Sequence, residues 1–323
     1  MRRNLTIVLL CLVCVSRSLR LPQPRRSPRL SCSRLDSEED RSTRTAIREH
    51  LQKKEFKLCY ELLQSNPLLH VDLEDAKALL NGMQAMDVGE ETQETIDMAS
   101  FLYKRLARQR VLRGFGCIEG DYPESGGDIS PAKLEEVSGI PISALTPKER
   151  TTYWRLAGIV LCLAEYAVGE RLGIDPLYTL IPATFAVFLS DQFFLKGAAF
   201  ETVYQRLFPE YRKKVIYHEA GHFLLAYLLG VPVRDCITSA WEARRNKEIK
   251  GQAGTVFYDT RVAEELASQK ISRSSINRLS VIIMAGIAAE ANHFGRAEGG
   301  IADEQSLVPY QYLASLSTHG GRR

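Results

Sequence analysis

The chain contains 323 residues, 45% of them hydrophobic, which is enough for one large core or two small ones. Its net charge of +3 conceals an asymmetry, because residues 1–35 hold eight Arg and no acidic side chain, and the rest holds 34 basic and 39 acidic residues. No run of basic residues interleaved with aromatic ones is present, so nucleic acid is not expected as a partner. The seven cysteines lack the spacing of a disulfide-rich scaffold.

Residues 1–40 are predicted to be a targeting leader. The segment "MRRNLTIVLLCLVCVSRS" has a basic start and an apolar core from Leu5 to Val15, which is the pattern of a signal peptide. The next segment, "LRLPQPRRSPRLSCSRL", is rich in Arg, Ser and Pro, as transit peptides are. A signal followed by a transit segment resembles the two-part leaders of algae with secondary plastids, so we expect a plastid location. The alternative is a secretory signal followed by a disordered linker.

Residues 41–112 are predicted to form a small helical N-terminal domain. Apolar side chains at helical spacing indicate one helix from Ile47 to Leu63, a second from Ala76 to Met83 and a third from Ile96 to Leu106. A docking domain fits this pattern better than a helical-repeat scaffold, because no clear repeat period is present.

Residues 113–150 are predicted to be a linker, since "GFGCIEGDYPESGGDISP" is dense in Gly and Pro. At the end of this linker, "TPKE" has the pattern of a helix start, with Thr146 as the N-cap residue and Pro147 in the first turn.

Residues 151–200 are predicted to form a hydrophobic hairpin. Two uncharged stretches, Leu156–Ala164 and Pro176–Ser190, are each shorter than the roughly 20 apolar residues of a membrane-spanning helix. Glu165 would also be costly within lipid. Flanking aromatic side chains could extend both stretches, so a membrane anchor and a hairpin buried inside a soluble protein both remain open.

Residues 201–323 carry the chemistry. A helix is predicted from Pro209 through "VIYHEAGHFLLAYLLG" to "GVP", followed by β-prone pieces at 231–239 and 254–258. The segments "TRVAEELASQ" and "SSINRLSVIIMAGIAAEANHFG" predict two further helices, and "YLASLSTHGGRR" is expected to be a polar tail. The fold class expected for the chain is therefore mainly α with a short β element.

The stretch "HEAGH" places His218 and His222 four positions apart, so both imidazoles lie on one face of the predicted helix. Two nitrogen ligands at this distance can bind one Zn²⁺, and Glu219 beside them can reach a water on the metal without being a ligand. This arrangement is the H-E-x-x-H pattern of zinc peptidases, with Glu219 as the catalytic base. The alternative is a pair of hydrogen-bonded histidines in a protein core.

A catalytic zinc needs three protein ligands and one open position. Three nearby side chains are candidates for the third ligand: Glu290, His293 and Asp303. Glu290 would complete a site of the thermolysin type, and His293 would complete a site of three histidines.

Over roughly residues 203–306 the chain resembles the peptidase domain of FtsH-type membrane zinc metalloproteases. The resemblance rests on "YHEAGH" and on "GIAAEANHFG", in which Gly286, Ala289, Glu290 and Gly295 match a pattern of that family. The chain is also similar to shorter FtsH-like proteins of plant and algal chloroplasts that lack the ATPase module. This resemblance implies a zincin-like helical peptidase domain with zinc as cofactor.

The resemblance also implies two further roles. It favours Asp303, in "GGIAD", as the third zinc ligand. It makes "GQAGTVFYD" a strand at the edge of the active-site cleft, where an extended substrate backbone could pair with the strand, and Gly254 and Thr255 are the candidate substrate-binding residues.

The chain departs from that family in two ways. No G-x-x-x-x-G-K-[ST] motif is present, so the chain alone is not expected to couple ATP hydrolysis to unfolding. Only 20 residues follow Asp303, so the peptidase domain over 201–323 is expected to be short at its C-terminus. The expected function is a zinc-dependent metalloendopeptidase of plastid protein turnover. The alternative is a non-proteolytic FtsH-like scaffold or partner subunit of a membrane protease complex.

The expected partners follow from this reading. Protein or peptide substrates and a membrane are expected, together with ATPase-bearing FtsH-type subunits or a homo-oligomer.

Overall fold

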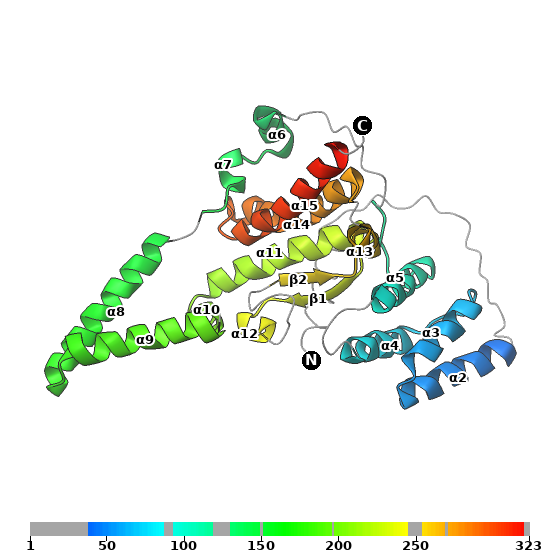
Figure 1. Ribbon diagram of the computed structural model, residues 1–323, viewed down its shortest axis with the longest axis horizontal. Coiled ribbons are helices and arrows are strands. Elements are labelled where there is room, and N and C mark those ends of the chain that lie inside the picture. Colours follow the sequence, from blue (N-terminus) through cyan, green and yellow to red (C-terminus); the bar gives the residue numbers. More distant parts are fainter. Residues whose placement is uncertain are drawn as a thin grey trace. The chain divides into compact units, whose positions relative to one another are not determined.

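A computed structural model describes residues 38–86, 93–118, 130–148, 151–195, 197–244, 254–268 and 271–319 (Figure 1). These residues are mainly helical and contain one two-stranded sheet, as the expected fold class requires. The chain divides into two compact units. The first comprises residues 1–119, 227–232 and 258–264, and the second comprises the remainder. Residues 1–37, which hold most of the predicted leader, lie outside the described residues.

Four complete helices lie among the described residues of the first unit. They are α2 (Glu38–Lys53), α3 (Phe56–Ser65), α4 (Leu73–Met86) and α5 (Gln93–Arg108). Their inward faces form one apolar core, whose most buried members are Cys59, Leu63, Ala76, Leu79 and Leu102. The helices predicted around Ala76 and Ile96 are confirmed as α4 and α5.

The single helix predicted from Ile47 to Leu63 is wrong, because the chain turns between α2 and α3. Lys54 adopts a positive φ of 62°, and the amide of Glu55 donates to the carbonyl of His50 at 2.9 Å. The turn lets α3 fold back so that Ile47 and Leu63 enter the same core. Apolar spacing continued across the break, which is why periodicity alone suggested one helix.

The predicted linker contains two short helices, α6 (Pro131–Ser138) and α7 (Ile142–Leu145). The helix start predicted at Thr146 is wrong. The Thr146 hydroxyl instead donates to the carbonyl of Ile142 at 3.1 Å and closes α7, and the next described helix begins at Thr151. A Thr hydroxyl can serve either end of a helix, so local sequence did not decide between the two.

Residues 151–195 form a pair of adjacent helices that we call the arm. The first is α8 (Thr151–Leu172). The second is continuous from Pro176 to Leu195 and consists of α9 (Ile181–Ser190) between two single π-helical turns. Figure 1 shows the two helices meeting at the end of the arm and diverging from there, and the hydroxyl of Thr184 donates to Glu165 between them. Both helices are longer than the uncharged stretches in the sequence.

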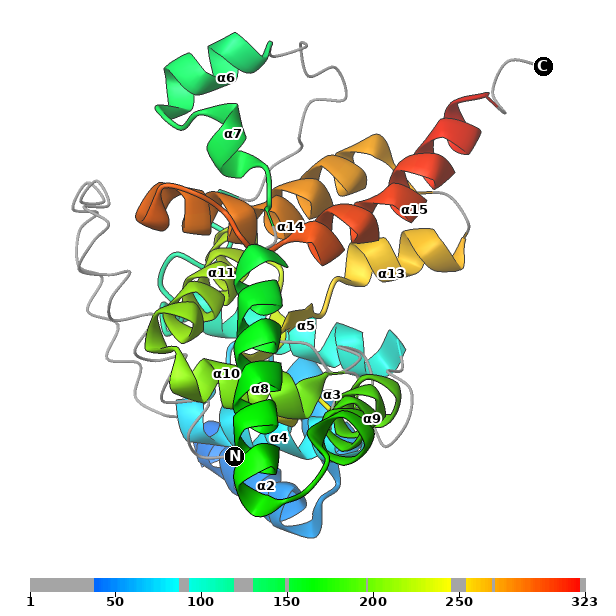
Figure 2. The same ribbon diagram turned by 90° about the vertical axis from the view of Figure 1, so that its left-hand side faces the viewer.

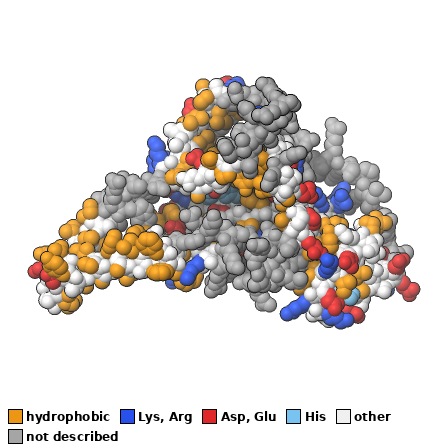
Figure 3. Space-filling view, viewed as in Figure 1, with side chains coloured by type: hydrophobic (Ala, Val, Ile, Leu, Met, Phe, Trp, Pro, Cys, Tyr) orange, Lys and Arg blue, Asp and Glu red, His pale blue; other side chains and the backbone are white. Residues whose placement is uncertain are grey.

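Apolar side chains cover the outside of the arm (Figure 3). The most exposed are Val160, Leu163, Leu172, Tyr178, Val187, Phe193 and Phe194. Among the described residues, Pro176–Leu195 is the one helical stretch long and apolar enough to cross a membrane, and little of it is buried. The described part of the chain therefore does not bury this hairpin inside a protein core.

Beyond the arm lie α10 (Ala198–Leu207) and α11 (Pro209–Leu228). The start of α11 at Pro209 confirms the prediction, and Gly230 follows its end with φ of 73°. Strands β1 (Val233–Ile237) and β2 (Gly254–Phe257) pair antiparallel and confirm the two β-prone pieces. The short helix α12 (Ala240–Ala243) follows β1.

Three helices complete the described chain. They are α13 (Thr260–Ala267), α14 (Arg273–Phe294) and α15 (Ile301–His319), of which the first two were predicted. No helix was predicted at α15, which continues through the segment expected to be a polar tail as far as His319. Its Leu and Ala residues favour a helix, which the count of polar residues concealed. In Figures 1 and 2, α14 and α15 lie against each other.

Candidate metal centre

The first two candidate ligands lie one turn apart on α11. His218 and His222 are 8% and 6% exposed, and their ring centroids are 4.7 Å apart. The Nδ1–H of His222 donates to the carbonyl of Ile282 on α14 at 2.8 Å, and Nδ1 of His218 lies 2.8 Å from Oε1 of Glu290 on the same helix. Because each Nδ1 contacts an oxygen of α14, each Nε2 points away from that oxygen and is available to a metal.

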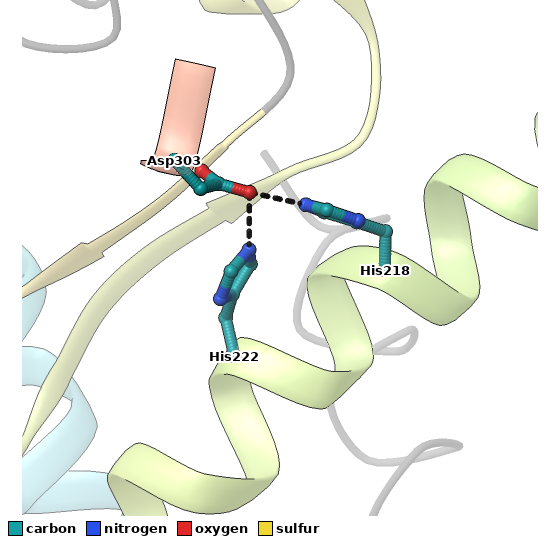
Figure 4. A group of neighbouring side chains, drawn as sticks. All are labelled: His218, His222 and Asp303. Carbon is teal, nitrogen blue, oxygen red and sulfur yellow. Dashed lines mark hydrogen bonds and ion pairs between the residues drawn. The ribbon is translucent and has the colours of Figure 1, made fainter. Parts of the chain in front are cut away.

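The third candidate comes from the first turn of α15. Oδ2 of Asp303 lies 2.8 Å from Nε2 of His218 and 3.4 Å from Nε2 of His222 (Figure 4). One potential ligand atom from each of the three side chains lies within 4.8 Å of the others. The three groups expected to hold a metal are therefore brought together. A pair of core histidines would not require a third acidic side chain facing both Nε2 atoms.

The two rival third ligands do not join this cluster. Glu290 is 2% exposed, and its Oε1 already contacts His218. Its Oε2 accepts from the amides of Glu298 at 2.9 Å and Gly299 at 3.3 Å. His293 stacks on Tyr217, with ring centroids 4.0 Å apart and an interplanar angle of 16°. The geometry thus favours Asp303 as the third ligand and makes Glu290 the group that orients His218.

Glycines keep the space around these side chains open. A Cβ at Gly286 would lie 2.5 Å from Nε2 of His222 and 2.6 Å from Nε2 of His218, which is closer than any real contact of this kind. A Cβ at Gly221 would lie 2.5 Å from the carbonyl of Ala285, so this glycine lets α11 and α14 approach each other. Gly300 has φ of 104° where the chain turns into α15, a conformation that glycine adopts at least cost.

Glu219 lies beside the cluster and is 4% exposed. Its Oε2 accepts a hydrogen bond of 2.8 Å from the hydroxyl of Thr255 on β2. Gly254 begins the same strand, so both predicted substrate-binding residues lie on the strand next to the predicted catalytic base. Within the described residues, β2 pairs with β1 on one side, which leaves its other edge for a further strand.

The acidic neighbours of His218 change its protonation in the metal-free protein. Burial lowers the pKa of His218 and is the largest single influence. The hydrogen bonds to Asp303 and Glu290, together with the negative charges nearby, outweigh burial and raise this pKa to about 10. His218 is therefore an imidazolium at neutral pH when no metal is bound, and it donates from both ring nitrogens.

The carboxyl groups differ in the sign of their shifts. Burial is the largest influence on Asp303 and would raise its pKa, but the interactions with His218 and His222 together outweigh it and lower that pKa. The pKa of Glu290 is lowered in the same way, against burial, by His218 and the amide of Glu298. Burial raises the pKa of Glu219, and the interaction with the nearby histidines only reduces that rise. Two carboxylates are thus held ionised, whereas burial makes the carboxylate of Glu219 a stronger proton acceptor, as a base needs.

The donor set suits zinc. Neutral imidazole nitrogens and a carboxylate are common zinc ligands, and three of them leave the fourth position open. The hydrogen bonds behind His218 and His222 are those that fix metal-binding histidines in proteins.

Sequence reasoning missed three contributors to this site: the carbonyl of Ile282, the role of Glu290 behind His218, and the Thr255 hydroxyl against Glu219. A backbone carbonyl carries no signal in the side-chain sequence. The buried Glu290 within an apolar helix was a signal, although it was weighed as a ligand. No known protein family, curated protein or solved structure matches this chain, so the case for its chemistry rests on the site itself.

Proposed function

We propose that this chain is a zinc-dependent metalloendopeptidase that cleaves proteins or peptides. The single observation that supports this most is the convergence of His218, His222 and Asp303, with Glu219 adjacent but bonded elsewhere. A structural histidine pair would not need a buried carboxylate at the position of Glu219, since an unused buried acid is costly.

Zinc at this site would supply a water of lowered pKa and would polarise the scissile carbonyl. Glu219 would take a proton from that water and deliver it to the leaving amine. The free edge of β2 would hold an extended substrate by backbone hydrogen bonds at Gly254 and Thr255, so that cleavage would tolerate varied side chains. His218 and Asp303 would keep their positions through Glu290 and the first turn of α15.

The function is tested with the purified mature protein on a casein-type substrate, with zinc content measured in parallel. Glu219→Gln keeps the size of the side chain but removes the base, so we expect turnover to fall by at least about 10²-fold while zinc content stays near one per chain. The control is Glu264→Gln, an exposed carboxyl on α13, which should change neither quantity. Equal turnover of Glu219→Gln and wild type would reject Glu219 as the base. A zinc-loaded but inactive wild type would favour the scaffold alternative.

We also propose that the arm attaches the protein to a bilayer and that the protein acts in plastid protein turnover. The exposed apolar surface of the arm supports the first part, and the composition of the leader supports the second. ATPase-bearing subunits of FtsH type, or further copies of this chain, would be its partners in the membrane.

The leader proposal has its own test. We expect residues 1 to about 35 to be absent from the mature protein, because their composition is that of signal and transit segments. N-terminal sequencing of native material checks this. A native chain that begins at Met1 would reject both leader segments.

A further inference from the structure

The Glu219 carboxyl is buried, yet one hydrogen-bond donor holds it. Among the described residues, that donor is Thr255, at 2.8 Å from Oε2. The partner belongs to β2, whereas Glu219 belongs to α11, so the bond joins the candidate base to the sheet rather than to its own helix. No residue that the structure describes donates a hydrogen bond to the other carboxyl oxygen, Oε1.

The Thr255 hydroxyl has one proton to donate, and two acceptors lie near it. The carboxyl oxygen of Glu219 is 2.8 Å away, and the sulfur of Cys236, its partner residue across the β1–β2 pair, is 3.7 Å away. A carboxylate accepts far more strongly than a thiol, so the proton goes to Glu219. The hydroxyl is therefore committed to Glu219, and a substrate would meet only the backbone of Thr255.

We propose that Thr255 is a positioning residue that fixes the orientation of the Glu219 carboxyl through this hydrogen bond. The inference rests on the proposed peptidase function and deepens it. A Glu side chain has three rotatable bonds, and proton transfer requires one of its oxygens to stay within hydrogen-bond reach of the water. A bond that holds Oε2 leaves Oε1 in a single direction, and the loss of such preorganisation typically costs a large factor in rate.

The geometry also places this bond on the strand whose free edge is proposed to receive the substrate. Thr255 lies one position after Gly254, so the residue that orients the base belongs to the same four-residue strand that would pair with the substrate backbone. A shift of β2 along α11 would therefore displace the substrate and the base together.

The first test uses three variants of the zinc-loaded full chain. Thr255→Val keeps the shape and removes the donor, so we expect kcat to fall about tenfold to a hundredfold with KM and zinc content unchanged. Thr255→Ser keeps the donor and should restore most of kcat. Cys236→Ala, on the opposite strand, is the matched control and should stay near wild type. A Thr255→Val enzyme with the kcat of wild type would overturn the proposal, as would equal losses for Ser and Val.

A second test asks whether Thr255 acts through Glu219. In a Glu219→Gln enzyme the base is absent, so adding Thr255→Val should cause no further loss of kcat. A further loss equal to that seen in the wild-type background would overturn the proposal. Thr255→Ala repeats the comparison if Thr255→Val folds poorly.

A third measurement does not depend on activity. The denaturant midpoints of metal-free wild type, Thr255→Val, Glu219→Met and the double variant form a cycle, in which Met has about the length of Glu and no oxygen to accept the bond. If the two side chains are bonded, the stability losses of the two single variants, added together, should exceed the loss in the double variant. Strict additivity would overturn the proposal. If wild type bound no zinc and cleaved nothing, the proposed function would fail, and this cycle would still decide whether Thr255 holds Glu219.

Discussion

Two parts of this molecule are apolar helices that carry ionisable side chains, and the structure surrounds them differently. In α11 the polar groups of His218, Glu219 and His222 are buried and bonded to residues of other elements. In the arm, Glu165 has the hydroxyl of the neighbouring helix as partner, while the apolar side chains face outward.

The difference shows that hydropathy alone indicates only that a segment is buried away from water. It does not record whether protein or lipid replaces the water. The distinction lies in distant residues: the partners of His218 are 72 and 85 positions away, whereas the partner of Glu165 is 19 positions away within the same hairpin. Where the polar partners of an apolar helix lie far along the chain, as they do for α11, the helix belongs to a protein core.

The largest effect is expected at the ligands. His222→Ala should abolish stoichiometric zinc binding after dialysis, because two remaining ligands hold zinc far more weakly than three. His293→Ala is the matched control, since His293 stacks on Tyr217 outside the cluster and should leave zinc content at about one per chain. Metal analysis of both proteins measures this. Full zinc in His222→Ala would reject the ligand assignment.

Gly286→Ala should have almost as large an effect on zinc while the fold survives. The added methyl would enter the space of both Nε2 atoms, and these ends of flexible side chains would turn aside. Gly158→Ala is the control, because nothing lies within 4 Å of a Cβ there. Zinc titration and circular dichroism of both variants test this. Undiminished zinc affinity in Gly286→Ala would contradict the described placement of the two rings.

Glu290→Gln should weaken zinc binding by about 10- to 100-fold, the usual effect of losing the acceptor behind a metal-binding histidine. The amides of Glu298 and Gly299 would still find an acceptor in the Gln oxygen, so folding should be retained. Glu304→Gln, an exposed change in α15, serves as control. Complete loss of zinc, as in a ligand variant, would make Glu290 the third ligand in place of Asp303.

Zinc binding should release about one proton per chain at pH 7. In the metal-free protein the pKa of His218 is about 10, above the usual 6.5, so the ring is charged at pH 7 and must lose a proton to bind metal. Apparent zinc affinity should therefore rise roughly tenfold per pH unit between pH 7 and 9. Calorimetric titrations in two buffers of different ionisation enthalpy count the protons. No proton release would show that His218 is neutral before zinc binds.

The same shift makes a prediction about the metal-free protein. The stability that the raised pKa of His218 contributes is fully present below pH 6.5 and is lost as the pH rises through about 10. The lowered pKa values of Asp303 and Glu290 contribute stability at higher pH, which is lost on acidification. Stability of the metal-free form should consequently peak between these two losses.

The smallest effect is expected in the arm. Mature wild type should resist carbonate extraction and should float with phospholipid vesicles, because the exposed apolar side chains of the arm leave water there. Phe194→Ser should weaken vesicle binding by about tenfold, the free energy of partly burying one Phe. Leu68→Ser removes a similarly exposed apolar side chain from the first unit and should change nothing. A wild type found wholly in the soluble fraction would mean that another protein covers the arm.

Local signals predicted much of this fold. The start of α11 at Pro209, its end before Gly230, the two strands and the run of α14 all follow from helix punctuation and apolar spacing. The turn at Lys54 and the extent of α15 did not follow. The turn depends on how α3 packs, and the helix-favouring Leu and Ala residues of α15 stand among polar ones.

The candidate site was predictable to the same degree. His218, Glu219 and His222 lie within five positions of one helix, so their spacing alone predicted a metal site. The choice among Glu290, His293 and Asp303 needed tertiary structure, because all three lie more than 65 positions away along the chain. Thr255 was expected to contact substrate, and only its position opposite Glu219 showed that its hydroxyl is occupied.

The shortness of α10 has a consequence for the range of the site. Only residues 196–208 separate the arm from α11, and α10 accounts for 10 of them. At about 1.5 Å per helical residue, His218 can lie no more than about 40 Å along the chain from Leu195. Asp191 shortens this distance further. Its carboxylate accepts hydrogen bonds from the amides of Ala199 and Phe200 and so holds the end of the arm against the start of α10. With the arm in a bilayer, the site could reach membrane-proximal loops and tails but not distant parts of large soluble domains.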